Sequence, residues 1–126
     1  MLLEKIQSPK DVKVLPMPQL HELAQEIRDG ILNRDSNIGG HVGPNLGIVE
    51  ATIAMHYVFN CPEDKFVFDV SHQSYPHKML TGRAFGYYDN NRFQEISGYS
   101  SPAESPEYDQ FELGHTSTSI SLASGL

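Results

Sequence analysis

A short run of aromatic and β-branched residues is the feature that most constrains how this chain can fold. The run DKFVFDV, residues 64–70, is apolar at its centre and polar at its ends. Such a run is typical of a β-strand that is covered on both faces, as the strands of parallel sheets are. Helix-like segments lie before and after it. The alternation predicts a layered α/β fold with a parallel sheet flanked by helices.

Two helix-like segments precede the run. In residues 18–33, apolar residues recur at steps of three and four with polar residues between them, and they are Leu20, Leu23, Ile27 and Ile31. This spacing predicts an amphipathic helix. Residues 45–60 are apolar on nearly every side, which predicts a buried helix with Asn45 as its N-cap.

The second half of the chain is less regular. Residues 84–113 are rich in Gly, Ser, Pro, Asn and Tyr, and they predict a long loop with at most one short helix. Loops of this length in compact domains are often functional. The last residues, GHTSTSISLASGL, predict a loop that leads into a helix without a terminating signal. We therefore expect the chain to be part of a longer protein.

Charge and cysteine content narrow the classes of partner and compartment. Nine Lys and Arg against sixteen Asp and Glu give a net charge of −7, which disfavours nucleic acid and anionic membranes as partners. The single cysteine, Cys61, excludes an intrachain disulfide and suggests a cytoplasmic protein. A buried apolar role for Cys61 is favoured over a redox role. No run approaches the roughly 20 apolar residues of a membrane span, so we expect no membrane contact.

Three histidines lie next to glycine or at the end of the predicted strand. They are His41 in GGHVG, His72 in DVSHQ and His115 in LGHTS. Ligands bind beyond the carboxyl ends of the strands in parallel sheets, so we expect these three residues to face one crevice. The alternative is that each is an ordinary hydrogen-bonding residue of a loop.

The residues before the last helix-like segment could bind an anion. Gly114, His115 and Thr116 could present N–H groups and a hydroxyl to a phosphate. Simple capping of the helix by Thr116 or Ser117 is an equal alternative. The zinc motifs HExxH and CxxC, the phosphate-binding motifs GxGxxG and GxxxxGK[ST], and the hydrolase motif GxSxG do not occur. We assign no metal ligand.

Two basic residues follow His72 closely. Lys78 and Arg83 could contact a substrate phosphate, or they could cap helix carbonyls and pair with Asp69 or Asp109. The second interpretation is favoured.

Two long stretches are specific enough to indicate a family. GGHVGPNLGIVEATIAMHYVFNCPEDKFVFDVSHQSYPHKMLTGR and ESPEYDQFELGHTSTSIS closely resemble the N-terminal part of the 1-deoxy-D-xylulose-5-phosphate synthases, which are thiamine-diphosphate enzymes of the transketolase group. The resemblance runs from about Leu20 to the last residue. It implies that residues 1–126 are the N-terminal portion of a diphosphate-binding module with a partial thiamine-diphosphate-binding fold.

The resemblance also implies an activity. The full-length enzymes condense pyruvate with glyceraldehyde 3-phosphate, lose carbon dioxide, and supply precursors of isoprenoids, thiamine and pyridoxal. They use thiamine diphosphate with Mg²⁺ and are expected to be cytoplasmic homodimers. The metal ligands and the glutamate that activates the cofactor are expected outside this chain, so the 126 residues alone are expected to be inactive.

Matching residue by residue implies roles for the three loops. His72 resembles the family histidine that contacts thiamine diphosphate, and Gly114, His115 and Thr116 resemble a second cofactor-contacting loop. His41 resembles the histidine near the thiazolium and the substrate oxygens, where protons must be transferred.

Some residues depart from the family pattern. Ser71 stands where glycine is common and Thr116 where serine is common, and residues 84–101 replace a more basic segment. A related enzyme with another aldehyde acceptor therefore remains an alternative. So does a non-catalytic module that binds a companion chain.

Overall fold

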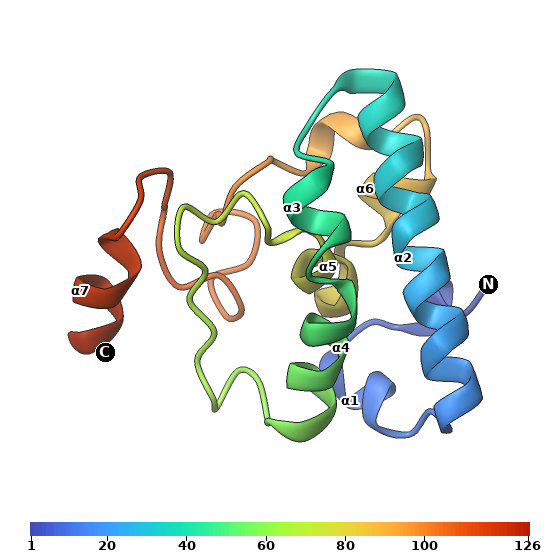
Figure 1. Cartoon of the computed structure of the whole chain (residues 1–126), viewed down its shortest axis with the longest axis horizontal. Coiled ribbons are helices and arrows are strands. Elements are labelled where there is room, and N and C mark those ends of the chain that lie inside the picture. The colour runs from blue at the N-terminus through green and yellow to red at the C-terminus, as the bar shows by residue number, and fades with distance from the viewer.

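The computed structural model describes residues 1–126, and helices are its regular elements (Figure 1). The α-helices are α1 (Pro9–Lys13), α2 (Met17–Ile38), α3 (Gly43–Leu46), α4 (Val49–Val58), α5 (Tyr75–Lys78), α6 (Phe85–Tyr88) and α7 (Thr118–Ser124). Short 3-10 turns span Leu3–Lys5 and Phe93–Glu95, and a kinked turn at Met79–Arg83 joins α5 to α6. None of these helices is both long and apolar enough to cross a membrane.

Helix α2 confirms the amphipathic helix predicted from residues 18–33 and extends beyond it. Pro18 lies in the first turn, where a missing N–H costs no helical hydrogen bond. Gly39, with φ of 84°, ends the helix. The buried face continues past residue 33 because Arg34 and Asp35 are also buried. The apolar pattern did not include these two residues because they are charged, although they lie on the buried face of the helix.

The apolar segment 45–60 does not form the single buried helix that was predicted. A break at Gly47 and Ile48 separates α3 from α4, and Asn45 lies within α3 rather than at an N-cap. Helix α4 buries residues of one side, including Val49 and Ile53. Its other side is exposed, so an all-round apolar pattern here marks a helix that is covered on one face only.

The hydrophobic core lies where α2 packs against α4 and α6, and α5 packs against α4. Its members come mainly from these helices: Leu23, Ala24, Ile27, Ile31, Val49, Ile53, Tyr75, Met79, Leu80, Ala84 and Tyr87. Leu3, Ile6 and Val12 add the N-terminal segment to it, and Ile96 adds the loop after α6. Gly82, with φ of 91°, brings its backbone against the carbonyl of Gln7, where a Cβ would lie 2.9 Å from that oxygen. The core is therefore built by residues 3–96.

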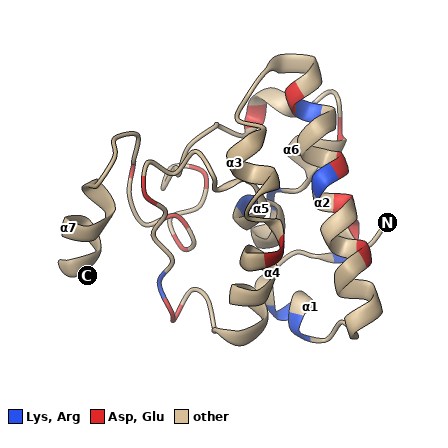
Figure 2. Ribbon diagram, viewed as in Figure 1, with Lys and Arg blue, Asp and Glu red and all other residues tan.

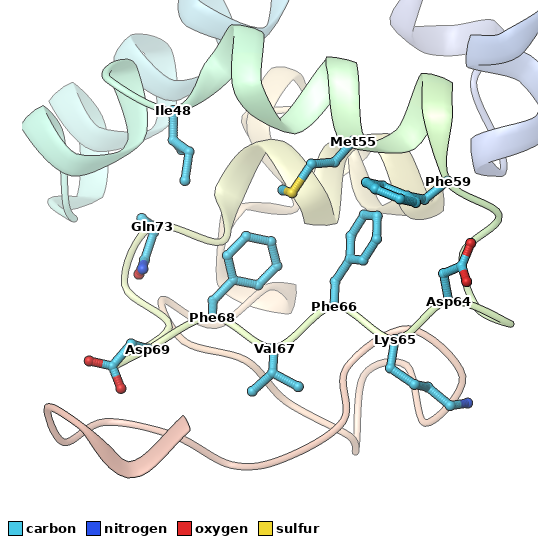
Figure 3. Close-up of a pocket in the computed structure, with 10 residues that line it drawn as sticks. All are labelled: Ile48, Met55, Phe59, Asp64, Lys65, Phe66, Val67, Phe68, Asp69 and Gln73. Atoms are coloured by element: carbon cyan, nitrogen blue, oxygen red, sulfur yellow. The ribbon is translucent and has the colours of Figure 1, made fainter. Parts of the chain in front are cut away.

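The predicted α/β class with a parallel sheet is wrong for this chain, because the structure contains no strand. Residues 65–68 have no helical or turn conformation and run alongside α4 (Figure 3). A β-strand exists only when its N–H and C=O groups bond to a neighbouring strand. The residues described here supply no such neighbour, so a run with strand character remains unpaired.

Residues 84–113 are mainly loop, as predicted, but they contain two short helical elements, α6 and one 3-10 turn, where at most one was expected. Helix α7 lies apart from the other helices, at the left of Figure 1. It buries no residue and carries no charged residue (Figure 2).

Candidate functional site

Two of the three predicted histidines lie together. His41 is in the loop between α2 and α3, and His72 is in the loop before α5. Their ring centroids are 5.5 Å apart in an edge-to-face arrangement. Both side chains are partly accessible. Residues 31 positions apart in the chain thus form one imidazole pair at the surface.

Asn45 holds the two loops in place. Its side-chain amide donates to the backbone carbonyls of His41 (2.7 Å) and His72 (2.8 Å), and its Oδ1 accepts the N–H of Tyr75 (3.0 Å). The residue is fully buried. An amide offers donors and an acceptor in one rigid group, which an aspartate or a leucine does not. Sequence reasoning treated Asn45 as a helix cap and so missed this role.

Two tyrosines surround the His41 ring. The Tyr75 hydroxyl lies 3.1 Å from Nδ1, and the Tyr99 hydroxyl lies 3.5 Å from Nε2. Burial lowers the pKa of His41 below its usual value, and the nearby His72 and Arg34 lower it further. The imidazole is therefore neutral at pH 7, so it can both donate and accept a hydrogen bond.

The two ring nitrogens of His72 differ in access. Nδ1 is buried and has no hydrogen-bond partner. Nε2 makes no hydrogen bond within the chain and is not among the buried unpaired atoms. A ligand would therefore meet His72 through Nε2.

The third predicted loop is held at both ends by the segment before His72: Ser71 Oγ donates to the carbonyl of Leu113 (2.9 Å), and Asp69 accepts the N–H of Ser117 (2.9 Å). Gly114, His115 and Thr116 are exposed just before α7, and His115 makes no hydrogen bond or ring contact with His41 or His72. The structure thus brings two of the three histidines together. The backbone N–H groups of these three residues have no acceptor in the chain.

Ser117 occupies the N-cap position of α7, but neither its side chain nor that of Thr116 makes the capping hydrogen bond that the alternative from the sequence required. The Asp69 carboxylate accepts the N–H of Ser117 (2.9 Å) and the N–H of Ser119 (3.2 Å). These hydrogen bonds lower the pKa of Asp69. An acidic residue 48 positions earlier in the chain therefore satisfies the helix end.

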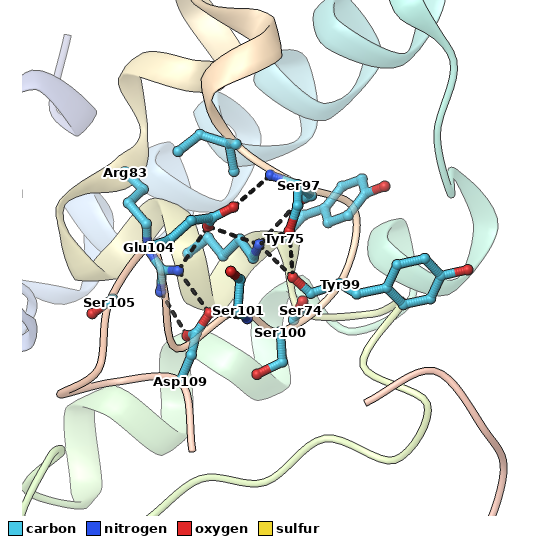
Figure 4. A network of polar contacts seen from close by, with 12 residues as sticks. Ser74, Tyr75, Arg83, Ser97, Tyr99, Ser100, Ser101, Glu104, Ser105 and Asp109 are labelled. Carbon is cyan, nitrogen blue, oxygen red and sulfur yellow. Dashed lines mark hydrogen bonds and ion pairs between the residues drawn. The ribbon is translucent and has the colours of Figure 1, made fainter. Parts of the chain in front are cut away.

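The basic residues after His72 form an internal ion network (Figure 4). Arg83 makes two 2.8 Å hydrogen bonds to the carboxylate of Asp109, which confirms the pairing predicted for it. Lys78 pairs with Glu104 at 2.9 Å, a partner that the sequence did not indicate. Lys78 also donates to the backbone carbonyls of Ser97 and Tyr99. The network ties the long loop to α5, and its cations are not presented to solvent.

Two further histidines lie beside the network. His56 Nε2 is 2.9 Å from Nδ1 of His77, and the rings are stacked. Burial lowers the pKa of His56 to about 3, with smaller effects from His77 and Lys13, so His56 is neutral. Cys61 is buried, as expected, and burial raises the pKa of its thiol to about 11. Neither residue is poised for acid–base or thiolate chemistry at pH 7.

A pocket of about 530 Å³ lies between α4 and residues 64–69 (Figure 3). Its apolar wall is formed by Ile48, Met55, Phe59, Phe66, Val67 and Phe68. His41 and His72 are not among its lining residues, although Gln73 is. No group of three or more His, Cys, Asp or Glu side chains is arranged so that it could hold a metal ion.

Comparison with known proteins points to one family. The family model described as 1-deoxy-D-xylulose-5-phosphate synthase matches residues 3–126. A synthase of that name from Dictyoglomus thermophilum is 54% identical over 125 residues, which are 99% of this chain and 20% of the relative. One from Chlamydia pneumoniae is 52% identical over 126 residues, 99% of this chain and 19% of the relative. The chain spans about a fifth of the length of the curated relatives that it matches.

Proposed function

Because the chain belongs to the 1-deoxy-D-xylulose-5-phosphate synthase family, we propose that it contributes the His41–His72 site to an enzyme that joins pyruvate to glyceraldehyde 3-phosphate with loss of carbon dioxide. The observation that carries the proposal is the imidazole pair that Asn45 holds between two loops. We also propose thiamine diphosphate as cofactor, with Mg²⁺, in a cytoplasmic homodimer. These last points rest on the family alone.

The residues present are compatible with thiamine diphosphate. His72 offers an accessible Nε2 whose hydrogen-bonding capacity is unused within the chain. Gly114, His115 and Thr116 offer backbone N–H groups without acceptors, which suits an anion such as a diphosphate. When bound, the cofactor would supply the group that stabilises a carbanion.

The chain's own residues would bind and move protons. In this proposal His72 donates a hydrogen bond to the cofactor. His41, neutral at pH 7, donates to or accepts from the oxygens of the substrate. Lys78 and Arg83 have no part in binding the substrate phosphate, because their charges are matched by Glu104 and Asp109.

A chimera tests the proposal. Residues 1–126 replace the matching fifth of the Dictyoglomus thermophilum synthase, which is 54% identical to them. We expect the chimera to form 1-deoxy-D-xylulose 5-phosphate from pyruvate and glyceraldehyde 3-phosphate, and only with thiamine diphosphate. Its rate should be within about tenfold of the parent, which corresponds to a difference in activation free energy of less than about 1.4 kcal/mol. A chimera that melts like the parent but forms no product contradicts the proposal and favours a non-catalytic module. Product formed only with a different aldehyde would indicate a related enzyme.

A further inference from the structure

Tyr75 is the fully buried residue whose hydroxyl contacts His41 twice. The hydroxyl oxygen accepts the backbone N–H of His41 at 3.2 Å and lies 3.1 Å from Nδ1 of the same residue. The side chain has 0% exposure. The hydroxyl makes no other hydrogen bond within the chain.

The position of one proton follows from these contacts. Leaving a buried O–H without an acceptor costs about 1–3 kcal/mol. If Nδ1 of His41 carried a proton, the Tyr75 oxygen would face two N–H donors and its own proton would have no acceptor. The hydroxyl therefore donates to Nδ1, which leaves the imidazole proton on Nε2.

The surroundings keep the Tyr75 hydroxyl in place. Glycine at positions 40 and 98 leaves room for the Tyr75 hydroxyl. A Cβ at either position would lie 3.1 Å from the hydroxyl oxygen, which is closer than most Cβ contacts. The guanidinium of Arg34 lies 5.3 Å from the centroid of the Tyr75 ring. The ring is thus fixed on one side by a cation and at its tip by two backbone segments.

We propose that Tyr75 is a positioning residue that holds His41 in the tautomer with its proton on Nε2, so that His41 meets the substrate as a hydrogen-bond donor. Nε2 is the ring nitrogen on the side of Tyr99, whose hydroxyl is 3.5 Å away and only weakly engaged. This assignment rests on the proposed function for its catalytic meaning, whereas the tautomer itself is a property of the chain.

The tautomer matters only while His41 is neutral. The groups that face the His41–Tyr75 contact are His72, Tyr99, Arg34 and, through Gly40, the carboxyl of Asp35. Burial, His72 and Arg34 all favour the uncharged imidazole. Near pH 7.5 the ring is neutral, and Tyr75 decides which nitrogen carries its proton.

The first test measures the ring nitrogens of His41 by long-range ¹H–¹⁵N NMR in the 126-residue chain at pH 7.5, assigned with His41→Gln. We expect Nε2 to show the shift of a protonated nitrogen and Nδ1 that of a hydrogen-bonded acceptor. In Tyr75→Phe the Nδ1 shift should move, because its donor is lost while the ring still fills its site. Tyr87→Phe is the matched control, since the Tyr87 hydroxyl is buried without a partner.

The second test is a double-mutant cycle in the chimera. Tyr75→Phe should lower kcat about 2- to 10-fold, the equivalent of one hydrogen bond, and leave the affinity for thiamine diphosphate unchanged. In the His41→Ala background the same change should have no further effect, because Tyr75 acts through His41. A purely structural role would lower the rate equally in both backgrounds.

The two readouts separate this inference from the proposed function. A protonated Nδ1 in the wild-type chain, or a His41 spectrum unchanged by Tyr75→Phe, overturns the role of Tyr75 whatever the enzyme does. A chimera that is inactive while the NMR shifts behave as expected overturns the proposed function and leaves the tautomer assignment standing.

Discussion

Replacing Asp109 by asparagine is expected to lower the free energy of unfolding by about 3 kcal/mol. Asp109 is 2% exposed, and Arg83, which it binds through two hydrogen bonds, is 5% exposed. Removing one partner of a buried ion pair leaves the other charge uncompensated, which costs about 3–5 kcal/mol. We expect the lower value because Glu104 still contacts Arg83 at 3.1 Å.

Urea denaturation at pH 7 measures this effect, with Glu95→Gln as the matched control. Glu95 pairs with Arg92 on the surface, where the two side chains are 49% and 42% exposed. Such a pair contributes about 0–1 kcal/mol, so the control should unfold almost like the wild type. Equal losses in both variants would show that the buried network does not hold the long loop.

The same carboxylate makes stability depend on acid pH. Burial alone would raise the pKa of Asp109, but the hydrogen bonds from Arg83 and His77 outweigh it and hold the pKa well below its usual range. A carboxyl whose pKa is lowered by folding stabilises the protein above its unfolded pKa of about 3.9. That contribution is lost as pH falls from about 4 towards the folded pKa. In Asp109→Asn, the free energy of unfolding should therefore fall less than in the wild type as the pH drops below about 4.

Replacing His41 by alanine in the chimera is expected to lower kcat by about 10²- to 10⁴-fold, the range for a lost proton-transferring group. Binding of thiamine diphosphate should change little, because His72 and the loop at 114–116 carry that role in our proposal. Steady-state rates and cofactor titration measure the two effects separately. His21→Ala is the control, since His21 is exposed on α2 and far from the pair in sequence.

The pH profile gives an independent check on His41. Its pKa lies below the usual value of about 6.5, so the neutral ring persists into mildly acidic solution. For the wild-type chimera, kcat/KM should therefore fall only below about pH 6.5. His41→Ala should lack the part of this fall that is due to His41. If the kcat of the His41→Ala chimera stayed within about twofold of the wild-type value, His41 would have no part in the reaction.

Local patterns predicted helices better than they predicted the fold class. The apolar steps of residues 18–33 indicated α2 because an amphipathic helix depends on its own periodicity. The run at 64–70 has the composition of a strand, but a strand depends on a partner that composition cannot provide. The sequence pattern does not indicate the break at Gly47, because apolar residues continue across it.

The candidate site was predicted in part. A glycine-flanked loop indicated His41 and the end of a predicted strand indicated His72, and the structure places those two together. Asn45 and Tyr75 were not recognised, because their importance comes from contacts 27 and 34 residues away in the chain. The partner of Lys78 was missed for the same reason. A side chain that joins distant loops leaves no periodic signal.

The most direct measurement of the central claim, that His41 and His72 form the cofactor and substrate site, is the affinity of the chimera for thiamine diphosphate with and without His72→Ala. Isothermal titration calorimetry at fixed Mg²⁺ gives both dissociation constants. A hydrogen bond to a charged group contributes about 1.5–3 kcal/mol, so the variant should bind about 10- to 150-fold more weakly. An unchanged dissociation constant in a variant that melts like the wild-type chimera would contradict the claim.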